Sequence, residues 1–354
     1  MIVNGHANVE YLGVESFLEL CATQMRGALP GPFPVADVRS PSEFVQGHIP
    51  GAVNIPLFSD AERAEVGTLH KRESPEAAAI RGLEIAGPKL GDLVRAAYAL
   101  CRGRTGGEMA LYCDRGRMRS SSVGWVLTMA GLRVRLLEGG YKAFRHHVLA
   151  SFERPLNLLV LGGKTGSGKT LVLRRMSAKG AQMVDLEGLA NHRGSAFGAL
   201  AGRPQPSCEQ FENSLSVALS RMRPDVPVWV EDECENLGTV NLPRAFFRQL
   251  KASPLLTLEV PDHIRLERVL EDYASLPRDY IAQRLDHIKK RLGGLEHSRA
   301  HACLSAGDLP GLAAILLTYY DRAYARQCLQ RPPAAVVRTG DPEEAAIRLL
   351  ELGF

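Results

Sequence analysis

Residues 156–173 read LNLLVLGGKTGSGKTLVL, and this stretch predicts the fold of the C-terminal half of the chain. A short apolar run leads directly into a glycine-rich loop at 163–170, and the pattern that follows is helical. Such a strand, loop and helix form a P-loop, whose backbone N–H groups surround an oligophosphate. The residues expected to bind phosphate are Gly163, Gly166, Ser167, Gly168, Lys169 and Thr170.

Two side chains of this loop add a charge and a metal ligand. Lys169 supplies a mobile cation, and the Thr170 hydroxyl can hold Mg²⁺. The helix after the loop presents its positive end to the same anion. The loop therefore indicates a phosphate or diphosphate ligand, without identifying the molecule that carries it.

Acidic residues follow another buried strand, 226–230, which leads into Glu231, Asp232 and Glu233. A carboxylate that leaves a strand beside the P-loop strand is a suitable ligand for Mg²⁺ and its waters. Thr170, Glu231 and Asp232 are therefore the expected magnesium ligands. The spacing leaves open which of the two acids lies nearer the metal.

A further predicted strand, 182–184, leads to Asp185, and Arg193 follows a few residues later. In P-loop transferases a carboxylate and arginines after the second strand commonly meet the second substrate. In the alternative interpretation Asp185 caps a helix and Arg193 is solvated. The spacing favours neither interpretation.

The remainder of the C-terminal half, 262–331, has a helical pattern. Four apolar residues fall on one helical face, namely Ile281, Leu285, Ile288 and Leu292. Basic residues crowd the opposite face, namely Arg284, Lys289, Lys290 and Arg291. Such a basic face can meet the phosphates of a nucleic acid, although a merely solvated face is the more common meaning of the pattern.

Composition limits the classes of protein that fit. The chain has 354 residues, a hydrophobic content of 45% and a formal net charge of +4, which suit a globular protein of two or three domains. The seven cysteines form no CxxC pair, which argues against a disulfide framework and a structural zinc site. We see no signal segment and no apolar run of membrane-spanning length, so we expect a cytoplasmic protein without a membrane partner.

The N-terminal half has the alternating strand and helix pattern of an α/β domain. Residues 109–112 predict a strand that ends at Cys113, and a loop and a helix follow. A cysteine that faces loop N–H groups and a helix start is favoured in its thiolate form, and Arg115 and Arg119 add positive charge. Cys113 is therefore a candidate nucleophile. His48 can be read as a base or, more simply, as a residue that holds a turn.

This half resembles the rhodanese family. The resemblance depends on Asp37-x-Arg39, Glu43-Phe44, Gly47-His-Ile-Pro-Gly51-Ala and Asn54-Ile-Pro56, with Glu138-Gly-Gly-Tyr-Lys-Ala-Phe144 as the usual close of the domain. We therefore expect an α/β protein with a rhodanese-like parallel sheet at 1–147 and a linker at 148–155. A P-loop NTPase-like α/β domain then occupies 156–354 and includes the helical segment 262–331.

The two halves together resemble the bacterial tRNA 2-selenouridine synthase family along essentially the whole chain. The resemblance is carried by Glu62-Arg63, Val66-Gly67-Thr68, Cys113-x-Arg115-Gly116, Met118-Arg119-Ser120, the P-loop, Asp185-Leu-Glu-Gly188, His192-Arg193-Gly194-Ser195, Glu231-Asp232-Glu233 with Asn236, and Lys289-Lys-Arg-Leu-Gly-Gly294. Arg117 departs from the pattern, because glycine is expected there.

The resemblance implies that wobble 2-thiouridine of tRNA becomes 2-selenouridine through an S-geranyl intermediate. Geranyl diphosphate and selenophosphate would be the co-substrates, with Mg²⁺ as a cofactor. The tRNA anticodon region and a selenophosphate-producing enzyme would be the partners. Cys113 would carry selenium as a selenopersulfide, and Gly67 joins Asp185 and Arg193 as second-substrate candidates.

Three other functions fit parts of the sequence. The span from Cys113 to Arg119 is Cys-x5-Arg, which also suits a phosphatase with Cys113 as nucleophile and Arg119 as phosphate clamp. A small-molecule kinase with a regulatory rhodanese module is a second alternative. A nucleotide-dependent RNA-binding protein without chemistry at Cys113 is a third. None of the three explains why both halves occur in one chain.

Overall fold

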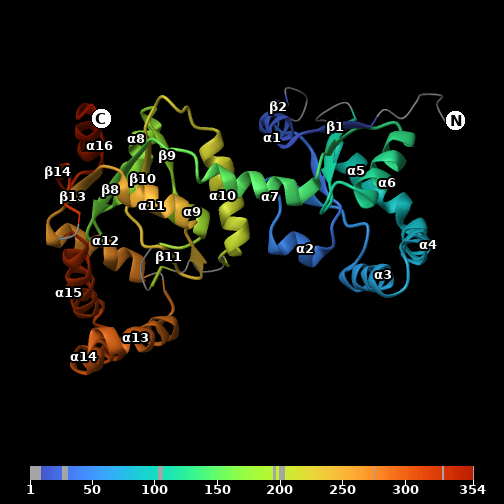
Figure 1. The fold of residues 1–354 in the computed structure, drawn as a ribbon. Coiled ribbons are helices and arrows are strands. Elements are labelled where there is room, and N and C mark those ends of the chain that lie inside the picture. Colours follow the sequence, from blue (N-terminus) through green and yellow to red (C-terminus); the bar gives the residue numbers. More distant parts are fainter. Residues whose placement is uncertain are drawn as a thin grey trace. The chain divides into compact units, whose positions relative to one another are not determined.

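The computed structural model describes residues 9–25, 31–102, 107–193, 197–198, 204–274, 276–328 and 331–353. The chain divides into two compact units, Met1–Ser151 and Phe152–Phe354 (Figure 1). Both units are built around a parallel sheet with helices on its faces. The predicted mixed α/β fold is confirmed.

The sheet of the first unit has five parallel strands in the order β1-β7-β6-β4-β5. These strands are β1 (Glu10–Leu12), β4 (Val35–Asp37), β5 (Val53–Asn54), β6 (Glu108–Tyr112) and β7 (Arg133–Leu137). Strand β2 (Gln24–Met25) pairs antiparallel with β3 (Gly31–Pro32) beside it in the sequence. Cys113 directly follows β6, whose last four residues are all buried.

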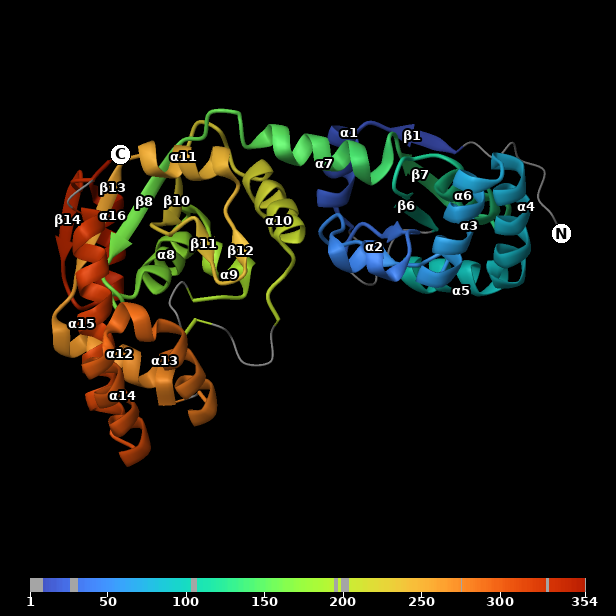
Figure 2. The ribbon, with the colours of Figure 1, turned by 60° about the horizontal axis from the view of Figure 1, so that its bottom comes forward.

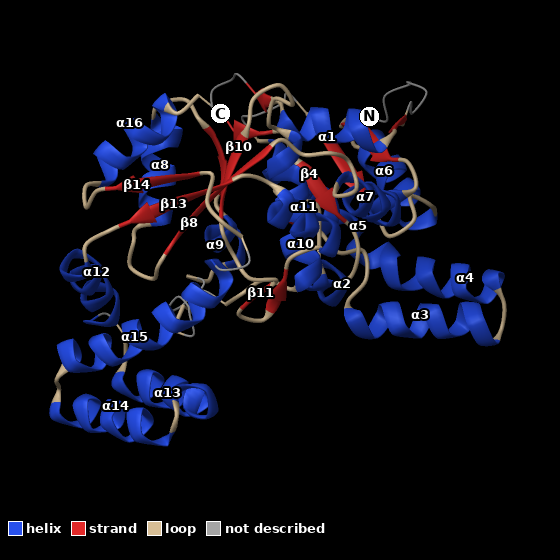
Figure 3. Cartoon of the chain, turned by 60° about the vertical axis from the view of Figure 1, so that its left-hand side comes forward, coloured by secondary structure: helices blue, strands red, loops and turns tan. Residues whose placement is uncertain are grey.

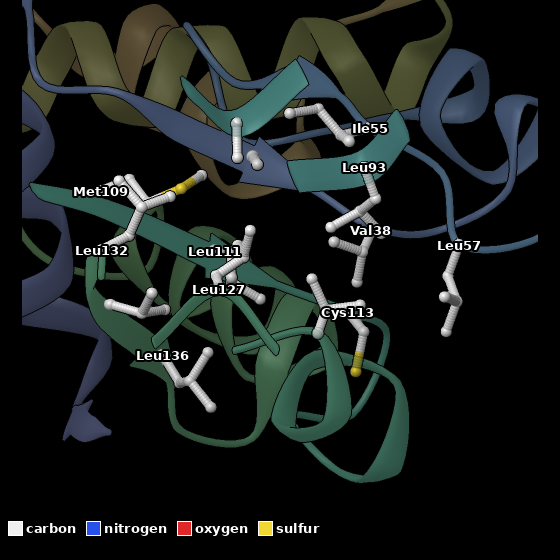
Figure 4. Close-up of a cluster of buried hydrophobic side chains, with 14 of the residues drawn as sticks. Val38, Ile55, Leu57, Leu93, Met109, Leu111, Cys113, Leu127, Leu132 and Leu136 are labelled. Carbon is white, nitrogen blue, oxygen red and sulfur yellow. The ribbon is translucent and has the colours of Figure 1, made fainter. Parts of the chain in front are cut away.

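Helices cover both faces of this sheet. They are α1 (Val14–Ala22), α2 (Pro41–Gln46), α3 (Asp60–Arg72), α4 (Pro75–Ala86), α5 (Leu90–Cys101), α6 (Met118–Met129) and α7 (Gly140–Ser151), with a 3₁₀ turn at Gly87–Lys89. Apolar side chains of β6, α5 and α6 share one buried cluster, and Cys113 lies at its edge (Figure 4). Alternation along β6 turns Tyr112 to the other face, where it contacts Phe17 of α1 and Tyr141 of α7.

A buried ion pair explains why the sequence carries Asp37-x-Arg39. The Asp37 carboxylate accepts from the Arg39 guanidinium at 2.7 Å, and the two residues are 0% and 3% exposed. Arg39 also donates to the Gly47 carbonyl at 2.6 Å and lies 3.7 Å from the centre of the Tyr141 ring. The pair therefore links β4, the turn after α2 and α7.

The sheet of the second unit is also fully parallel, in the order β14-β13-β8-β10-β9. Its strands are β8 (Leu158–Gly163), β9 (Gln182–Val184), β10 (Val228–Glu231), β13 (Leu255–Glu259) and β14 (Ala335–Arg338). Every residue of β8 is buried, as expected for a central strand covered on both faces. A short antiparallel pair, β11 (Asn236–Leu237) and β12 (Val240–Asn241), follows β10.

Helices cover this second sheet as well. They are α8 (Lys169–Ala178), α9 (Leu186–Ala190), α10 (Cys208–Ser220), α11 (Arg244–Ala252) and α16 (Pro342–Glu351). Helices α8 and α16 share one apolar cluster with β8, β10 and β13. Helix α11 packs against β8 and, in Figure 2, lies on the side of that strand opposite α8.

Four helices between β13 and β14 form a separate apolar core. They are α12 (Asp262–Ala274), α13 (Arg278–Leu292), α14 (Gly294–Ala306) and α15 (Leu309–Cys328), and Figure 3 shows α13, α14 and α15 packed together below the sheet. Ile281, Leu285, Ile288 and Leu292 are buried there, which confirms the predicted apolar face of α13. No helix among the described residues is both long and apolar enough to cross a lipid bilayer.

Two features differ from the sequence analysis. The sequence analysis did not identify strand β1, which has only three residues, none of them buried. The linker expected at 148–155 begins as helix, because α7 continues to Ser151. Val148 is 0% exposed within the first unit, and Phe152 stacks edge to face on Phe246 of the second.

The buried pair predicts a large effect of Asp37→Ala. The substitution leaves the Arg39 charge in the core without its carboxylate, which should lower the free energy of unfolding by roughly 3 kcal/mol. Hydrogen exchange of the β6 amides in the full chain measures this change for the first unit. Asp92→Ala is the control, because Asp92 pairs with Arg95 at an exposed site and should have little effect. Equal effects of both variants would contradict the role of the buried pair.

Candidate functional sites

Backbone geometry in the P-loop requires glycine at Gly166. Its φ is +79°, in the left-handed region, and a Cβ there would lie 2.7 Å from the Arg265 carbonyl oxygen. The loop therefore packs directly on α12, and α8 begins immediately after it with Gly168 as the N-cap. The positive end of α8 faces the loop.

Two arginines of α12 bind the carbonyl groups of the P-loop. Arg265 donates through Nε to the Thr165 carbonyl at 2.9 Å, and Arg268 donates to the Ser167 carbonyl at 2.8 Å. Arg265 is 1% exposed and also pairs with Asp321 of α15. These contacts hold the loop carbonyls away from the space that an anion needs. The sequence analysis missed both arginines, because about 100 residues separate them from the loop.

Side chains of the P-loop are arranged around the expected anion position. Lys169 Nζ donates to the Gly163 carbonyl at 3.1 Å, and the Thr170 hydroxyl donates to Glu187 at 3.1 Å. The Ser167 hydroxyl is buried and has no hydrogen-bond partner among the described residues. A phosphate oxygen would supply the missing partner.

Three glutamates gather beside Lys169 and Thr170. Glu231 is 0% exposed, and neither carboxylate oxygen has a hydrogen-bond partner among the described residues. Burial, followed by the charge of Glu187, raises the pKa of Glu231 to about 7 and the pKa of Glu233 to about 8. Burial also raises the pKa of Glu187. This cluster needs protons or a cation, and the sequence analysis assigned no role to Glu187 or Glu233.

Asp232 points away from this cluster. Strand β10 ends at Glu231, and the charges of Glu187 and Glu231 both act on Glu233. The Asp232 carboxylate accepts from Lys251 at 2.7 Å and lies 3.4 Å from Arg331. This placement disagrees with the expectation that Asp232 is a magnesium ligand, because its charge is already neutralised by two basic residues.

The second-substrate candidates occupy different places. Asp185 caps α9 by accepting from the Gly188 N–H at 2.7 Å, and it also pairs with Arg174 at 2.9 Å. Arg193 forms an ion pair with Asp272 of α12. Residues 194–196, which include the two residues after Arg193 in the family pattern, lie outside the described residues. The structure therefore agrees with the capping interpretation of Asp185 and connects Arg193 to the helical segment.

A neighbouring residue, His192, is a further polar group at this site. It is 5% exposed, and its Nδ1 has no hydrogen-bond partner among the described residues. Burial, and then the charge of Arg284, lower its pKa. Arg284 lies on α13 and donates through Nε to the Tyr280 hydroxyl at 3.1 Å. Three basic residues near the end of α13, Lys289, Lys290 and Arg291, are exposed.

The first unit holds the cysteine loop. Cys113 is 3% exposed, and its Sγ lies 3.1 Å from the Ser120 hydroxyl of α6. The Cys113 carbonyl accepts from the Tyr141 N–H at 2.9 Å, which fixes the start of the loop against α7. A Cβ on Gly140 would lie 2.4 Å from that carbonyl oxygen, and the φ of Gly140 is +61°. Glycine is therefore required where the loop and α7 meet.

Arginines around the cysteine loop are unequally placed. Arg119 donates to the Glu43 carboxylate at 2.8 Å, and Arg63 of α3 lies 3.7 Å from the same carboxylate. Arg115 is exposed and lies 3.5 Å from Asp114. An anion in this loop would thus compete with Glu43 for Arg119. Glu43 is a partner that the sequence analysis did not identify, since 76 residues separate it from Arg119.

Gly67 and His48 lie near this loop in the same unit. A Cβ on Gly67 would lie 2.5 Å from the Arg63 guanidinium, so Gly67 makes room for the arginine that approaches Glu43. His48 stacks on Phe44 with ring centres 3.9 Å apart, and its Nδ1 lies 3.0 Å from the Phe44 carbonyl oxygen. This contact agrees with the simpler interpretation of His48 as a residue that holds a turn.

The glutamate cluster predicts how stability depends on pH without a bound cation. The folded pKa values of Glu231 and Glu233 lie above the ordinary value of 4.5, so the folded state binds more protons than the unfolded state from about pH 5 upward. The free energy of unfolding of the second unit should therefore fall between pH 5 and pH 8, by up to about 6 kcal/mol if both glutamates contribute in full. Urea unfolding in chelator, followed by fluorescence, measures this change.

A variant that cannot ionise at position 231 tests whether Glu231 causes this pH dependence. The chain has two tryptophans, so Trp125→Phe leaves the buried Trp229 of β10 as the reporter for the second unit. In that background Glu231→Gln should reduce the pH dependence, since the amide does not ionise. Stability that rises between pH 5 and pH 8 in the metal-free protein would contradict the description of the cluster.

Comparisons with known proteins agree with the division of the chain into two units. Residues 156–351 match the tRNA 2-selenouridine synthase AAA domain, and residues 22–147 match the rhodanese-like domain. The tRNA 2-selenouridine synthase of Bordetella bronchiseptica is 35% identical over 89% of this chain and 93% of its own length. That of Shewanella halifaxensis is 34% identical over 90% of this chain and 95% of its own length.

A solved structure is also similar in sequence. It is the N-terminal domain of a Clostridium difficile 630 protein described as ATP/GTP binding. It is 33% identical, covers 40% of this chain and 99% of its own, and has a TM-score of 0.35, which is too low to bear on the fold. The family is shown by the domain models and the full-length relatives: the chain belongs to the tRNA 2-selenouridine synthase family.

Proposed function

We propose that the chain is a transferase that replaces the sulfur of wobble 2-thiouridine in tRNA by selenium. The route passes through S-geranyl-2-thiouridine and uses geranyl diphosphate and selenophosphate. The observation that carries the proposal is a P-loop with an unpartnered buried carboxylate at Glu231, in one chain with a cysteine loop at Cys113. Membership in the family gives the same reaction class.

In the first step the thiocarbonyl sulfur of tRNA attacks the allylic carbon of geranyl diphosphate. A carbon–sulfur bond forms, the bond from that carbon to oxygen breaks, and the uridine ring loses its N3 proton. Diphosphate departs with the charge that develops on it. The N–H groups of the P-loop, the end of α8 and Lys169 are positioned to stabilise that charge.

Mg²⁺ fits the residues beside the loop. The Thr170 hydroxyl and the oxygens of Glu187 and Glu231 are the hard ligands that this ion prefers. Glu231 supports the assignment most directly, because two buried oxygens without partners require a cation or a proton. When bound there, Mg²⁺ would neutralise the charge of the diphosphate.

In the second step selenium displaces the geranyl thiolate at C2 of the base. Selenophosphate already holds selenium at the oxidation level of selenide. Attack of the Cys113 thiolate on phosphorus would form a sulfur–phosphorus bond and release hydrogen selenide, and water would then free Cys113 and phosphate. Hydrogen selenide attacks C2, and geranyl thiol leaves with the proton. A selenopersulfide on Cys113 would require a two-electron oxidant to form and a reductant to release the selenium again, whereas the route through phosphorus requires neither.

Recognition of tRNA is proposed for the basic end of α13. Lys289, Lys290 and Arg291 are exposed there, and Arg284 lies on the same helix and is partly exposed. Phosphates of the anticodon region would bind these side chains. A selenophosphate-producing enzyme would supply the selenium donor, and a tRNA substrate would be met in the cytoplasm.

Lys169→Ala should lower the rate of geranyl transfer by about 100-fold, because the departing diphosphate loses its mobile cation. Mass spectrometry of tRNA nucleosides after incubation with geranyl diphosphate measures this rate. Lys179→Ala is the control, since Lys179 caps the far end of α8 and pairs with Glu343. Undiminished transfer by Lys169→Ala, or stoichiometric ATP hydrolysis during the reaction, would contradict the assignment of the P-loop.

Cys113→Ser should stop selenium insertion, with a loss of about 1,000-fold, and should leave geranylation intact. With both donors present, S-geranyl-2-thiouridine should therefore accumulate in tRNA. Cys21→Ser is the control, because Cys21 is only half-buried and lies outside the cysteine loop. Cys101 is less suitable, because it is 4% exposed within the core and its replacement would also change stability. Selenouridine formed by Cys113→Ser at the normal rate would show that the loop is no more than an anion site.

A further inference from the structure

Helices α13 and α14 bring an acid and two histidines together, away from the P-loop. His297 and His301 lie on α14, and Asp286 lies on α13. The Nε2 atoms of His297 and His301 lie 2.9 Å and 3.1 Å from the same atom, Oδ1 of Asp286. The two imidazole rings are 4.5 Å apart between centres. No step of the proposed reaction uses these residues.

The spacing of the two histidines suits a metal. Residues four apart on a helix share one face, so both rings of α14 point to the same side. The ligand atoms of all three residues lie within 4.8 Å of one another. Zinc ligands at about 2.0–2.1 Å in a tetrahedron lie about 3.3 Å apart, so the two distances from Asp286 to the histidines would each need to lengthen by only a few tenths of an ångström to admit the ion.

We propose that Asp286, His297 and His301 form a binding site for a divalent transition metal of the zinc class. Imidazole nitrogen favours such metals over Mg²⁺ and Ca²⁺, which prefer oxygen ligands. His297 is mostly covered, with 12% of its side chain exposed, while 63% of the Asp286 side chain is exposed. Water can therefore reach a fourth position, and each ring gives up its Nε2 proton when the metal binds.

The metal would cross-link α13 to α14. Asp286 lies one turn before the basic residues Lys289, Lys290 and Arg291, so the cross-link would hold the end of α13 that carries them. Within the separate helical core, α14 otherwise packs through buried residues such as Ala300 and Leu304. The existence of this cross-link between two helices does not depend on the proposed tRNA chemistry.

The test measures binding of the metal alone to the full chain. After treatment with chelator, the protein is titrated with Zn²⁺ in competition with a chromophoric chelator, and with Co²⁺ followed by absorption. We expect one saturable site per chain and a tetrahedral Co²⁺ spectrum without a thiolate charge-transfer band, which excludes the cysteines as ligands. His297→Gln with His301→Gln should weaken Zn²⁺ binding at least tenfold, and the glutamines can still hydrogen-bond Asp286.

His287→Gln is the matched control, because His287 is an exposed histidine of α13 adjacent to Asp286 and outside the cluster. It should bind Zn²⁺ like the wild type. Hydrogen exchange supplies a second readout: Zn²⁺ should slow exchange in α13 and α14 of the wild type and of His287→Gln, and should not do so in the double variant. Equal Zn²⁺ affinity in the double variant, or no saturable binding to the wild type, would overturn the proposal.

Discussion

Burial of acidic side chains directly beneath an anion-binding loop is the constraint on which the second unit depends. Glu187 and Glu231 lie beside Lys169 and Thr170, and a diphosphate in the loop would add further negative charge. Like charges of this kind cannot coexist in a poorly solvated site without compensation. Protons compensate them in the empty protein, and Lys169 with a divalent cation would do so with the substrate bound. In the proposed reaction, the binding of a cation and the binding of diphosphate would thus depend on each other.

Side-chain contacts also connect the P-loop to the helical segment between β13 and β14. Arg265 joins the Thr165 carbonyl of the loop to Asp321 of α15, and it is almost completely buried. A shift of α15 would therefore disturb the P-loop. Breaking the ion pair with Asp321 would leave the buried charge of Arg265 without its partner. The helical segment that carries the basic residues of α13 is consequently part of the phosphate site and not a separate attachment.

Local patterns in the sequence were sufficient for much of the fold. The bounds of β9 and the apolar face of α13 could be predicted, since each depends on neighbours within a few residues. Partners distant in sequence could not be predicted. Asp232 pairs with Lys251 and Arg331, and only the three-dimensional fold shows that it points away from the P-loop. The pairing of Glu43 with Arg119 escaped prediction for the same reason.

The central claim is that geranylation precedes selenium insertion and takes place on this one chain. The most direct measurement is mass spectrometry of nucleosides from 2-thiouridine tRNA incubated with the wild-type protein and each donor alone, then with both. The account predicts S-geranyl-2-thiouridine with geranyl diphosphate alone, no product with selenophosphate alone, and 2-selenouridine with both. Formation of 2-selenouridine from selenophosphate in the absence of geranyl diphosphate would contradict it.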